Sequence, residues 1–412
     1  MTPPIAAITE ILDDEMDTIL RMSMLALTTV LERPDPVPQH TSIRTGRIYT
    51  SELMQTESDP AFRDAARMGK PAFKELITLL KEKAGLRDSR KVSANEKLLI
   101  LIHVLKGHTN RDTKALFQHS GSTITTVLHD IVDRFMSIQG HFFRQPLPND
   151  AVPSCIGSNR KYYPWFKDCI GAEDGSHVAA IVNKALFDAF RDRKGHISQN
   201  VYAACDFRML FTYVLAGWEG SAHDMRVKDD AVAKGMAILD GKFRLGDAGI
   251  SLSANCLTPY RGVRYHLKEH ARAQAKPADY KELFNLRHAV LRNVIERVFG
   301  VLKKRFPILN NMQAYTYQFQ VKLVMVCFML HNFIRTTETY EDRFWKEADH
   351  EMEREGVRNA AAADENDSDE EDEEVAEEEV AEGPGANASA AALKKWRDDM
   401  AKAMWEDYVL NR

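Results

Sequence analysis

Three carboxylates in this chain stand where metal-dependent phosphodiester chemistry could use them. Asp174, in "GAEDGSH", and Asp247, in "LGDAG", each end a short strand-like run, and Glu296 lies on a basic helical stretch that follows. Magnesium prefers oxygen ligands, and a nuclease that uses two such ions needs a few carboxylates from different elements. We therefore predict that Asp174, Asp247 and Glu296 bind Mg²⁺ or Mn²⁺.

Each of these acids also has an ordinary structural interpretation. Asp174-Gly175 is typical of a hairpin turn. Arg292 precedes Glu296 by four residues, so on a helix the two would form an ion pair worth only about 0.2–0.5 kcal/mol. A fourth acid, Asp224, begins the helical stretch "DMRVKDDAVAKGMAIL" and is a further candidate ligand, although its position favours a helix N-cap.

The stretch "RNVIERVFGVLKKRFPIL" (residues 292–309) predicts an amphipathic helix, because its Val, Ile and Leu residues recur at helical spacing. The wider segment 260–306 contains 12 Lys or Arg residues against 4 Asp or Glu residues. Such a basic segment indicates a phosphate-rich partner, whereas the plain alternative is a solvated surface. The residues expected to contact phosphates are Arg297, Lys303, Lys304 and Arg305.

Composition narrows the class of protein. The 412 residues allow two or three domains, and 44% of them are hydrophobic. None of the five cysteines has C-x-x-C spacing, so a zinc ribbon or redox motif is not expected, and an odd number of isolated cysteines suits a reducing compartment. No signal peptide and no membrane span are expected, since acids interrupt the opening residues and no apolar run approaches about 20 residues.

The net charge of −5 conceals an uneven distribution. Residues 364–382 contain 13 acidic residues and no basic one, so the rest of the chain carries +8. This composition predicts a disordered acidic tail over residues 359–392. The final segment, 393–412, predicts an amphipathic helix in which Trp396 and Trp405 are too costly to leave exposed. It should therefore dock on the body of the protein or on another protein.

The N-terminal third is predicted to be helical. Residues 1–60 are poorly patterned and suggest a short helix followed by a loop, whereas 61–144 read as helices throughout. A break at Ser120-Gly121 between two of them is typical of a helix-turn-helix, although a plain helical bundle has the same turn. The small polar residues that could reach base edges are Ser122, Thr123, Thr125 and Thr126.

The sequence changes character after a proline-rich linker at 145–168. Residues 169–335 contain short runs rich in Val, Ile, Tyr and Phe, first in hairpin-like succession and then alternating with helices. The pattern predicts an α/β (or α+β) core with helices on the faces of a sheet. A helical extension is expected at 336–358.

Several motifs occur in order between residues 170 and 333: "GAEDGSH", "FTYVLAGWEGSAHDMRV", "LGDAG", "PYRGVRYHL", "ELFNLRHAVLRNVIERVFGVLKKRFPIL" and "CFMLHNF". Together they resemble the DDE endonuclease domain of Harbinger-type transposases and of the domesticated Harbinger-derived nucleases. The resemblance implies an RNase H-like fold and divalent-metal-dependent DNA cleavage with strand transfer. The catalytic acids would be Asp174, Asp247 and Glu296.

The same resemblance implies a cellular setting. It indicates action in the nucleus on transposon terminal repeats or related duplex DNA, aided by a Myb/SANT-like helper protein; a homo-oligomer is a further expectation. Two residues depart from the family pattern: Glu173 replaces an apolar residue before Asp174, and Ile250 replaces a tyrosine after Asp247. Because side chains alternate along a strand, Glu173 should point away from Asp174.

Two alternatives share parts of this pattern. One is a domesticated DNA-binding or scaffold protein that no longer cuts. The other is an RNA-directed RNase H-like nuclease, against which a helix-turn-helix would favour duplex DNA. All three acids of the triad are present, which favours an active nuclease.

Overall fold

The computed structural model describes residues 16–26, 37–263, 276–338, 343–354 and 388–411. Contacts divide the chain into two units, Met1–Ile43 and Arg44–Arg412. In the first unit, residues 16–26 form an exposed helix, which is the short helix expected near the N-terminus. The acidic stretch 364–382, predicted to be disordered, lies outside the described residues.

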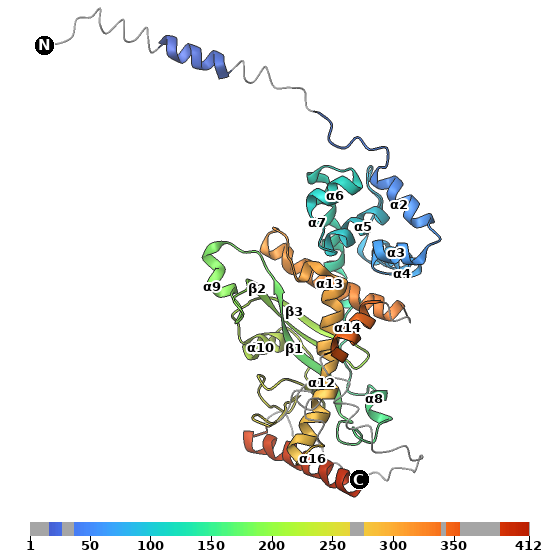
Figure 1. Cartoon of the computed structure of the whole chain (residues 1–412), viewed down its shortest axis with the longest axis vertical. Coiled ribbons are helices and arrows are strands. Elements are labelled where there is room, and N and C mark those ends of the chain that lie inside the picture. The colour runs from blue at the N-terminus through green and yellow to red at the C-terminus, as the bar shows by residue number, and fades with distance from the viewer. Residues whose placement is uncertain (1–15, 27–36, 264–275, 339–342, 355–387, 412) are drawn as a thin grey trace, which may run out of the picture. The chain divides into compact units, whose positions relative to one another are not determined.

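Helices build the N-terminal part of the second unit (Figure 1). They are α2 (Gly46–Gln55), α3 (Asp59–Ala66), α4 (Lys70–Ala84), α5 (Ala94–Leu105), α6 (Asn110–Phe117) and α7 (Gly121–Ser137). The hydroxyls of Ser58, Ser93 and Ser120 each accept a hydrogen bond from a backbone N–H in the first turn of α3, α5 and α7. Helix α2 lies within the segment for which a loop was expected.

Helices α6 and α7 are joined by the tight turn that the sequence predicts. Helix α6 ends at Phe117, Gln118 adopts a left-handed φ of 56°, and Ser120 caps α7. Helix α7 packs against α4, α5 and α6, and also against α13 (Tyr317–Thr337) from the C-terminal half of the chain. The helical region therefore shares a core with the part that carries the three acids.

In the described part of the chain, five strands form one sheet. They are β1 (Cys169–Ala179), β2 (Ser198–Cys205), β3 (Phe211–Glu219), β4 (Phe243–Leu245) and β5 (Cys256–Leu257), in the order β3-β2-β1-β4-β5. Strands β1, β2 and β3 pair antiparallel, whereas β4 runs parallel to both β1 and β5. This mixed sheet with its helices confirms the predicted α/β core and agrees with the expected RNase H-like arrangement.

The predicted hairpin turn at Asp174-Gly175 is wrong. Strand β1 runs without a break through both residues, and its pairing with β2 continues on either side of them. The connection to β2 instead occupies residues 180–197 and includes η2 (Lys184–Leu186) and α9 (Phe187–Phe190). Asp174 therefore lies in the middle of a strand and not at its end.

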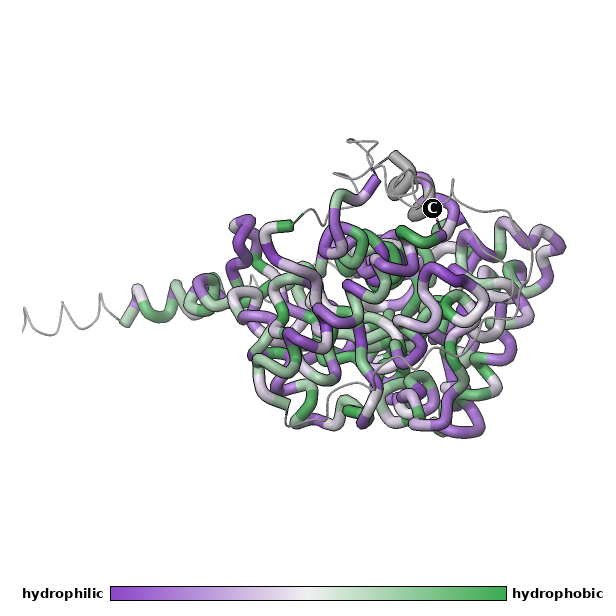
Figure 2. Tube along the Cα trace, turned by 90° about the horizontal axis from the view of Figure 1, so that it is seen from below, coloured by the Kyte–Doolittle hydropathy of each residue, from purple (hydrophilic) through white to green (hydrophobic). Residues whose placement is uncertain are grey.

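Helices cover both faces of the sheet. Helix α12 (Tyr280–Arg305) packs on β1 and α13 packs on β3, while α10 (Asp224–Ala233) packs on the opposite face, on β2 and β3. In Figure 2, hydrophilic stretches lie mostly along the periphery and hydrophobic stretches run between them. Among the described residues, no helix combines the length and the apolar character that crossing a membrane requires.

Two further helices pack beside α12. Helix α14 (Arg343–Arg354) lies in the expected extension, and α16 (Ala390–Leu410) is the expected terminal helix. The ring of Trp396 is buried 5.3 Å from the ring of Phe243, and the Tyr260 hydroxyl donates a hydrogen bond to Asp398 over 2.6 Å. Helix α16 thus docks on the body of the protein. A short helix, α8 (Ser154–Gly157), interrupts the expected linker.

Candidate active site

Asp174 lies on the face of β1 that is covered by α12. Its Oδ2 atom is 3.0 Å from Nη1 of Arg292, a residue of α12 that is only 7% exposed. The second guanidinium nitrogen of Arg292, Nη2, donates to Glu296, one turn further along the helix. The ion pair between Arg292 and Glu296 that the spacing suggested is therefore present, but it is shared with Asp174.

Asp247 reaches the same place from the neighbouring strand. Strands β1 and β4 are parallel, with Ala172 paired to Leu245, and Asp174 and Asp247 each lie two residues beyond that pair. Adjacent strands are about 4.8 Å apart, so the two aspartates emerge side by side. Asp247 Oδ1 accepts hydrogen bonds from the backbone N–H groups that follow it, at 2.8 and 3.1 Å, which fixes its loop.

The electrostatics of Asp174 reflect this crowding. Burial raises the pKa of Asp174 to about 7; Arg292 lowers it, and the neighbouring carboxylates of Asp247 and Glu296 raise it. Asp174 is thus close enough to both acids to feel their charge. Asp174 and Glu296 thus share one guanidinium, and Asp247 lies near Asp174.

The donor chemistry at this site suits magnesium or manganese, since carboxylate oxygens are the ligands these ions prefer. Asp174 and Glu296 share one guanidinium and Asp247 lies near Asp174, so a divalent cation could balance the charge of the three carboxylates. In the described ranges, however, no group of three His, Cys, Asp or Glu side chains has the geometry to hold a metal ion. Arg292 forms ion pairs with both Asp174 and Glu296, so its guanidinium occupies the position that a metal ion bound by these two acids would take.

Glu173 points to the opposite face of the sheet, as the alternation of side chains predicted. It is 1% exposed, and its Oε1 atom lies 2.5 Å from Nζ of Lys228 on α10. The unusual acid before Asp174 therefore has its own buried partner and stays out of the active site. Ile250, the second departure from the family pattern, is buried in the core on the α10 face.

Asp224 also lies on the α10 face. Its Oδ1 atom accepts a hydrogen bond of 2.9 Å from Asn200, and a Cβ placed on Gly175 would come within 2.4 Å of that oxygen. A side chain at position 175 would therefore displace the Asp224 carboxylate. Asp224 is not the helix N-cap that its position suggested, because His223 takes that place without a side-chain hydrogen bond. The backbone of β1 separates it from the Asp174 side.

Only one of the four predicted phosphate-binding cations lies beside the acids. Lys303 donates from Nζ to Ser176 Oγ at 2.8 Å and to the carbonyl of His177 at 2.9 Å, both in β1. Arg305 has no exposed surface, so the expectation that it contacts phosphate needs correction. Its guanidinium lies 5.5 Å from the ring centroid of Phe344 in α14.

The other two cations also face α14. Arg297 lies 5.6 Å from the ring centroid of Trp345, and Nζ of Lys304 donates to the backbone carbonyl of Glu347 at 3.2 Å. Both are half-buried. Arg297, Lys304 and Arg305 of α12 therefore contribute mainly to the packing of α14 against α12.

The small polar residues at the start of α7 have mixed surroundings. Ser122, Thr125 and Thr126 are exposed, whereas Thr123 is half-buried and shares a hydrogen bond with Ser120. Exposed hydroxyls at a helix N-terminus are compatible with contact to DNA, but they are far from the acids in sequence.

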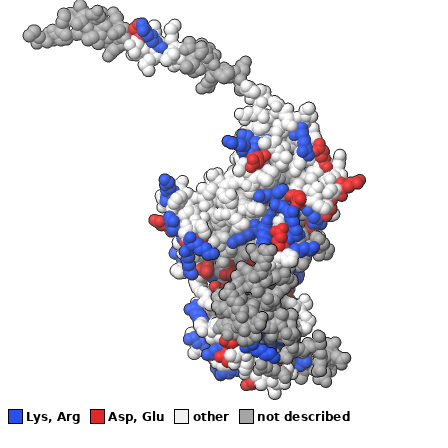
Figure 3. Space-filling model, viewed as in Figure 1, with Lys and Arg blue, Asp and Glu red and all other residues white. Residues whose placement is uncertain are grey.

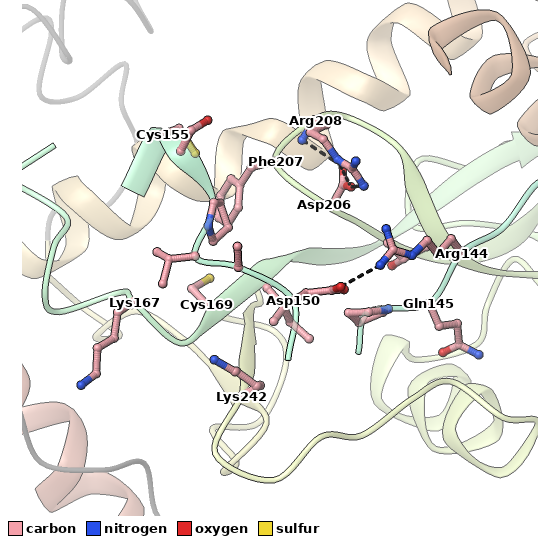
Figure 4. A pocket seen from close by; sticks show the side chains of 17 residues that line it. Arg144, Gln145, Asp150, Cys155, Lys167, Cys169, Asp206, Phe207, Arg208 and Lys242 are labelled. Carbon is pink, nitrogen blue, oxygen red and sulfur yellow. Dashed lines mark hydrogen bonds and ion pairs between the residues drawn. The ribbon is translucent and has the colours of Figure 1, made fainter. Parts of the chain in front are cut away.

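A pocket of about 340 Å³ lies at the other end of β1 (Figure 4). Its lining includes Cys169 at the start of β1 and Lys242 just before β4, but none of the three acids. Its charged side chains are largely matched: Arg144 pairs with Asp150 over 2.7 Å, and Lys242 lies 2.9 Å from Asp168. This pocket is separate from the candidate active site.

The comparisons with known proteins agree with the fold. Residues 174–332 match the family described as DDE superfamily endonuclease, and residues 41–137 match a family described as a domain of unknown function (DUF8040). No solved structure matches. The first match begins at Asp174 and includes Asp247 and Glu296. The chain thus contains an endonuclease domain of the DDE superfamily.

Relatives narrow this class. The chain is 24% identical to "Protein ALP1-like" of Arabidopsis thaliana over 69% of its own length and 73% of that protein's. It is 28% identical to "Putative nuclease HARBI1" of Bos taurus and 27% identical to that of Homo sapiens, in each case over 40% of this chain and 45% of the relative. The chain therefore spans less than half of each HARBI1 protein. These relatives include proteins named as putative nucleases.

Proposed function

We propose that this protein is a divalent-metal-dependent DNA endonuclease of the Harbinger type, with Asp174, Asp247 and Glu296 as its catalytic acids. The convergence of these side chains from β1, the loop after β4 and α12 carries the proposal. Two Mg²⁺ or Mn²⁺ ions, when bound, would supply activation of water and then of a DNA 3′-hydroxyl, and stabilise the leaving oxygen.

The residues of the chain have distinct roles in this reaction. Asp174, Asp247 and Glu296 would hold the ions through carboxylate oxygens. Arg292 would have to release at least one of its two acids, because its guanidinium now binds both Asp174 and Glu296. Lys303, anchored on β1 by Ser176 and His177, would place a positive charge beside the scissile phosphate.

The helical region is proposed to bind duplex DNA. Helix α7 presents the exposed hydroxyls of Ser122, Thr125 and Thr126 after the tight turn at Ser120, as a recognition helix would. Because α7 packs on α13, DNA held there would be kept in a fixed relation to the endonuclease domain.

One observation favours a second candidate function, that of a DNA-binding protein that does not cut. Arg292 pairs with both Asp174 and Glu296, as it would in a structural ion-pair network. A protein that had lost cleavage could retain this network for stability alone.

Cleavage and binding by Glu296→Gln separate the two candidates. Substitution by glutamine keeps the size of the side chain and removes a negative charge near the DNA. It should therefore leave DNA affinity unchanged or higher and abolish Mg²⁺-dependent cleavage of terminal-repeat DNA. Glu406→Gln, an exposed glutamate of α16, serves as the matched control. Normal cleavage by Glu296→Gln would remove Glu296 from the triad; a wild-type protein that binds but never cuts would establish the second function.

The family resemblance further supports nuclear action, strand transfer on transposon ends, a Myb/SANT-like helper protein and a homo-oligomer. Imaging of the tagged full chain in cells with and without such a helper would test nuclear action and the role of the helper protein. Exclusion from the nucleus in both cases would contradict the proposed setting.

A further inference from the structure

The connection between β1 and β2 carries a turn whose conformation is fixed by its own groups. Asp192 Oδ1 accepts hydrogen bonds from the backbone N–H groups of Lys194 and His196, both at 2.9 Å. The Asp192 carbonyl accepts from the N–H of Gly195 at 2.9 Å, and Gly195 has a φ of 86°, which favours glycine. The turn is therefore preorganised.

The base of the turn is anchored to the body of the protein. Phe190 is buried with its ring centroid 4.9 Å from that of Tyr317, the first residue of α13. The N–H of Ser221 donates to the carbonyl of Ala189 at 3.1 Å. Arg191 and Ile197 form an antiparallel bridge that closes the turn. The turn projects from a rigid support.

The charges of this turn are sorted by exposure. Arg191, Arg193 and Lys194 are exposed, whereas only 8% of the Asp192 side chain is exposed because it faces inward to the backbone. Asp188 of α9 is an exposed acid nearby. In Figure 3, Lys and Arg side chains gather at the margin that carries α9 in Figure 1. The outer surface of the turn is thus mainly cationic.

The turn leads into β2 where that strand pairs with β1. Ser198, which follows it, pairs with Ala179 of β1, and its hydroxyl is 3.0 Å from Nδ1 of His177, three residues beyond Asp174. Burial lowers the pKa of the Lys303 ammonium; Lys194 lowers it too, and Asp174 opposes this. Lys303 therefore feels both the turn and the catalytic strand.

We propose that the turn Arg191–His196 is a phosphate-binding element that holds the DNA backbone next to the Asp174 site, with Arg193 and Lys194 as its contacts. The inference rests on the proposed function in that the ligand is DNA. It adds a binding element that lies outside α12 and α7. Exposed cations on a preorganised turn lose little conformational freedom when they bind a phosphate.

DNA binding without cleavage tests this element. Affinity for a fluorescent duplex would be measured in EDTA across a salt series for wild type, for Arg193→Ala with Lys194→Ala, and for the control Lys394→Ala with Lys395→Ala, an exposed adjacent pair on α16. Loss of two phosphate contacts should weaken binding and flatten the log–log salt slope by about 1.8, at about 0.9 per contact. The control should match wild type.

A second variant tests the conformation of the turn while keeping its charge. Gly195→Ala introduces a side chain at a left-handed φ and should also weaken binding, whereas Gly241→Ala, at a φ of 70° and with the same open surroundings, should not. Wild-type affinity and slope in the Arg193/Lys194 variant would overturn the proposal while leaving the catalytic triad intact. If the wild-type protein did not bind DNA, both the turn proposal and the proposed nuclease function would be wrong. If the wild-type protein bound DNA but did not cleave it, the proposal for the turn would still hold.

Discussion

Two neighbouring carboxylates of β1 each meet a cation, on opposite faces of the sheet and with different consequences. Glu173 is buried against Lys228, with Tyr202 and Cys256 beside the pair. Asp174 shares Arg292 with Glu296 and also feels Asp247. The first pair balances one negative charge with one positive charge, whereas in the second two carboxylates share one guanidinium with a third carboxylate nearby. The two arrangements suggest a difference in role. An acid with its own cation stabilises the fold, whereas acids that share one cation are better placed to bind a further positive ion.

Glu173→Gln should produce the largest loss of stability, because it leaves Lys228 charged and buried without its partner. Breaking one partner of a buried pair costs about 3–5 kcal/mol. Urea unfolding would measure the free energy of unfolding. The double variant Glu173→Leu with Lys228→Met should recover most of it, since both charges are then removed. Equal stability of wild type and Glu173→Gln would show that this pair does not hold the α10 face.

Asp174→Asn should change stability in the opposite direction. Folding raises the pKa of this carboxyl from 3.8 to about 7, so the folded state binds the proton more tightly. Ionisation therefore opposes folding, and the stability of wild type should fall as the pH rises from about 4 to about 7. Asparagine cannot ionise, so the variant should gain stability in EDTA at pH 8, by at most about 4 kcal/mol at about 1.4 kcal/mol per pKa unit.

Calorimetry at pH 4 and pH 8 would check this reversal. The gain should be small at pH 4, where the folded-state carboxyl is protonated and the unfolded-state carboxyl is close to its pKa of 3.8. A loss of stability at pH 8 would mean that the Arg292 ion pair outweighs burial. Asp174→Asn should also lower cleavage activity. Replacing an outer-shell partner of a metal ligand costs roughly 10–100-fold in activity, and replacing a ligand itself should cost more.

Arg292→Gln should have an intermediate effect that depends on metal. Removing the guanidinium leaves Asp174 and Glu296 without their shared partner, which should lower metal-free stability by about 1–3 kcal/mol. The same change removes a competing cation, so Mn²⁺ should raise the melting temperature more in the variant than in wild type. An identical Mn²⁺ shift in both proteins would show that Arg292 does not compete with metal.

Lys303→Ala should have the smallest effect on folding and a measurable one on DNA. It removes one phosphate contact, so the log–log salt slope of DNA affinity should flatten by about 0.9. Arg305→Met keeps much of the buried volume beside Phe344 and should leave the slope unchanged. A slope that changes in Arg305→Met and not in Lys303→Ala would reverse the assignment of the two cations.

The proximity of Asp174, Asp247 and Glu296 could be predicted from the sequence because each occupies a characteristic place in a motif. The sequence could not show that Asp174 is in mid-strand, since Asp-Gly is a turn signal wherever it occurs. Here the close approach of Asp224 to Gly175, a contact between residues far apart in sequence, explains the glycine. The α/β core followed from local patterns, whereas this contact is tertiary.

The basic helix shows the same limit. Lys303, Lys304 and Arg305 are consecutive, and their spacing predicts three solvated or DNA-binding cations. The aromatic residues of α14 come about 40 residues later, and they bury Arg305. The turn Arg191–His196 carried no motif, and its position depends on the pairing of β1 with β2.

The location of bound manganese tests the central claim most directly. Crystals of the full chain grown with Mn²⁺ would be measured at the manganese absorption edge, so that anomalous peaks mark the ion. The account predicts manganese about 2 Å from carboxylate oxygens of Asp174 and Asp247, with Glu296 completing the site and Arg292 withdrawn from at least one acid. Manganese bound only elsewhere, with Arg292 still joining Asp174 and Glu296, would contradict it.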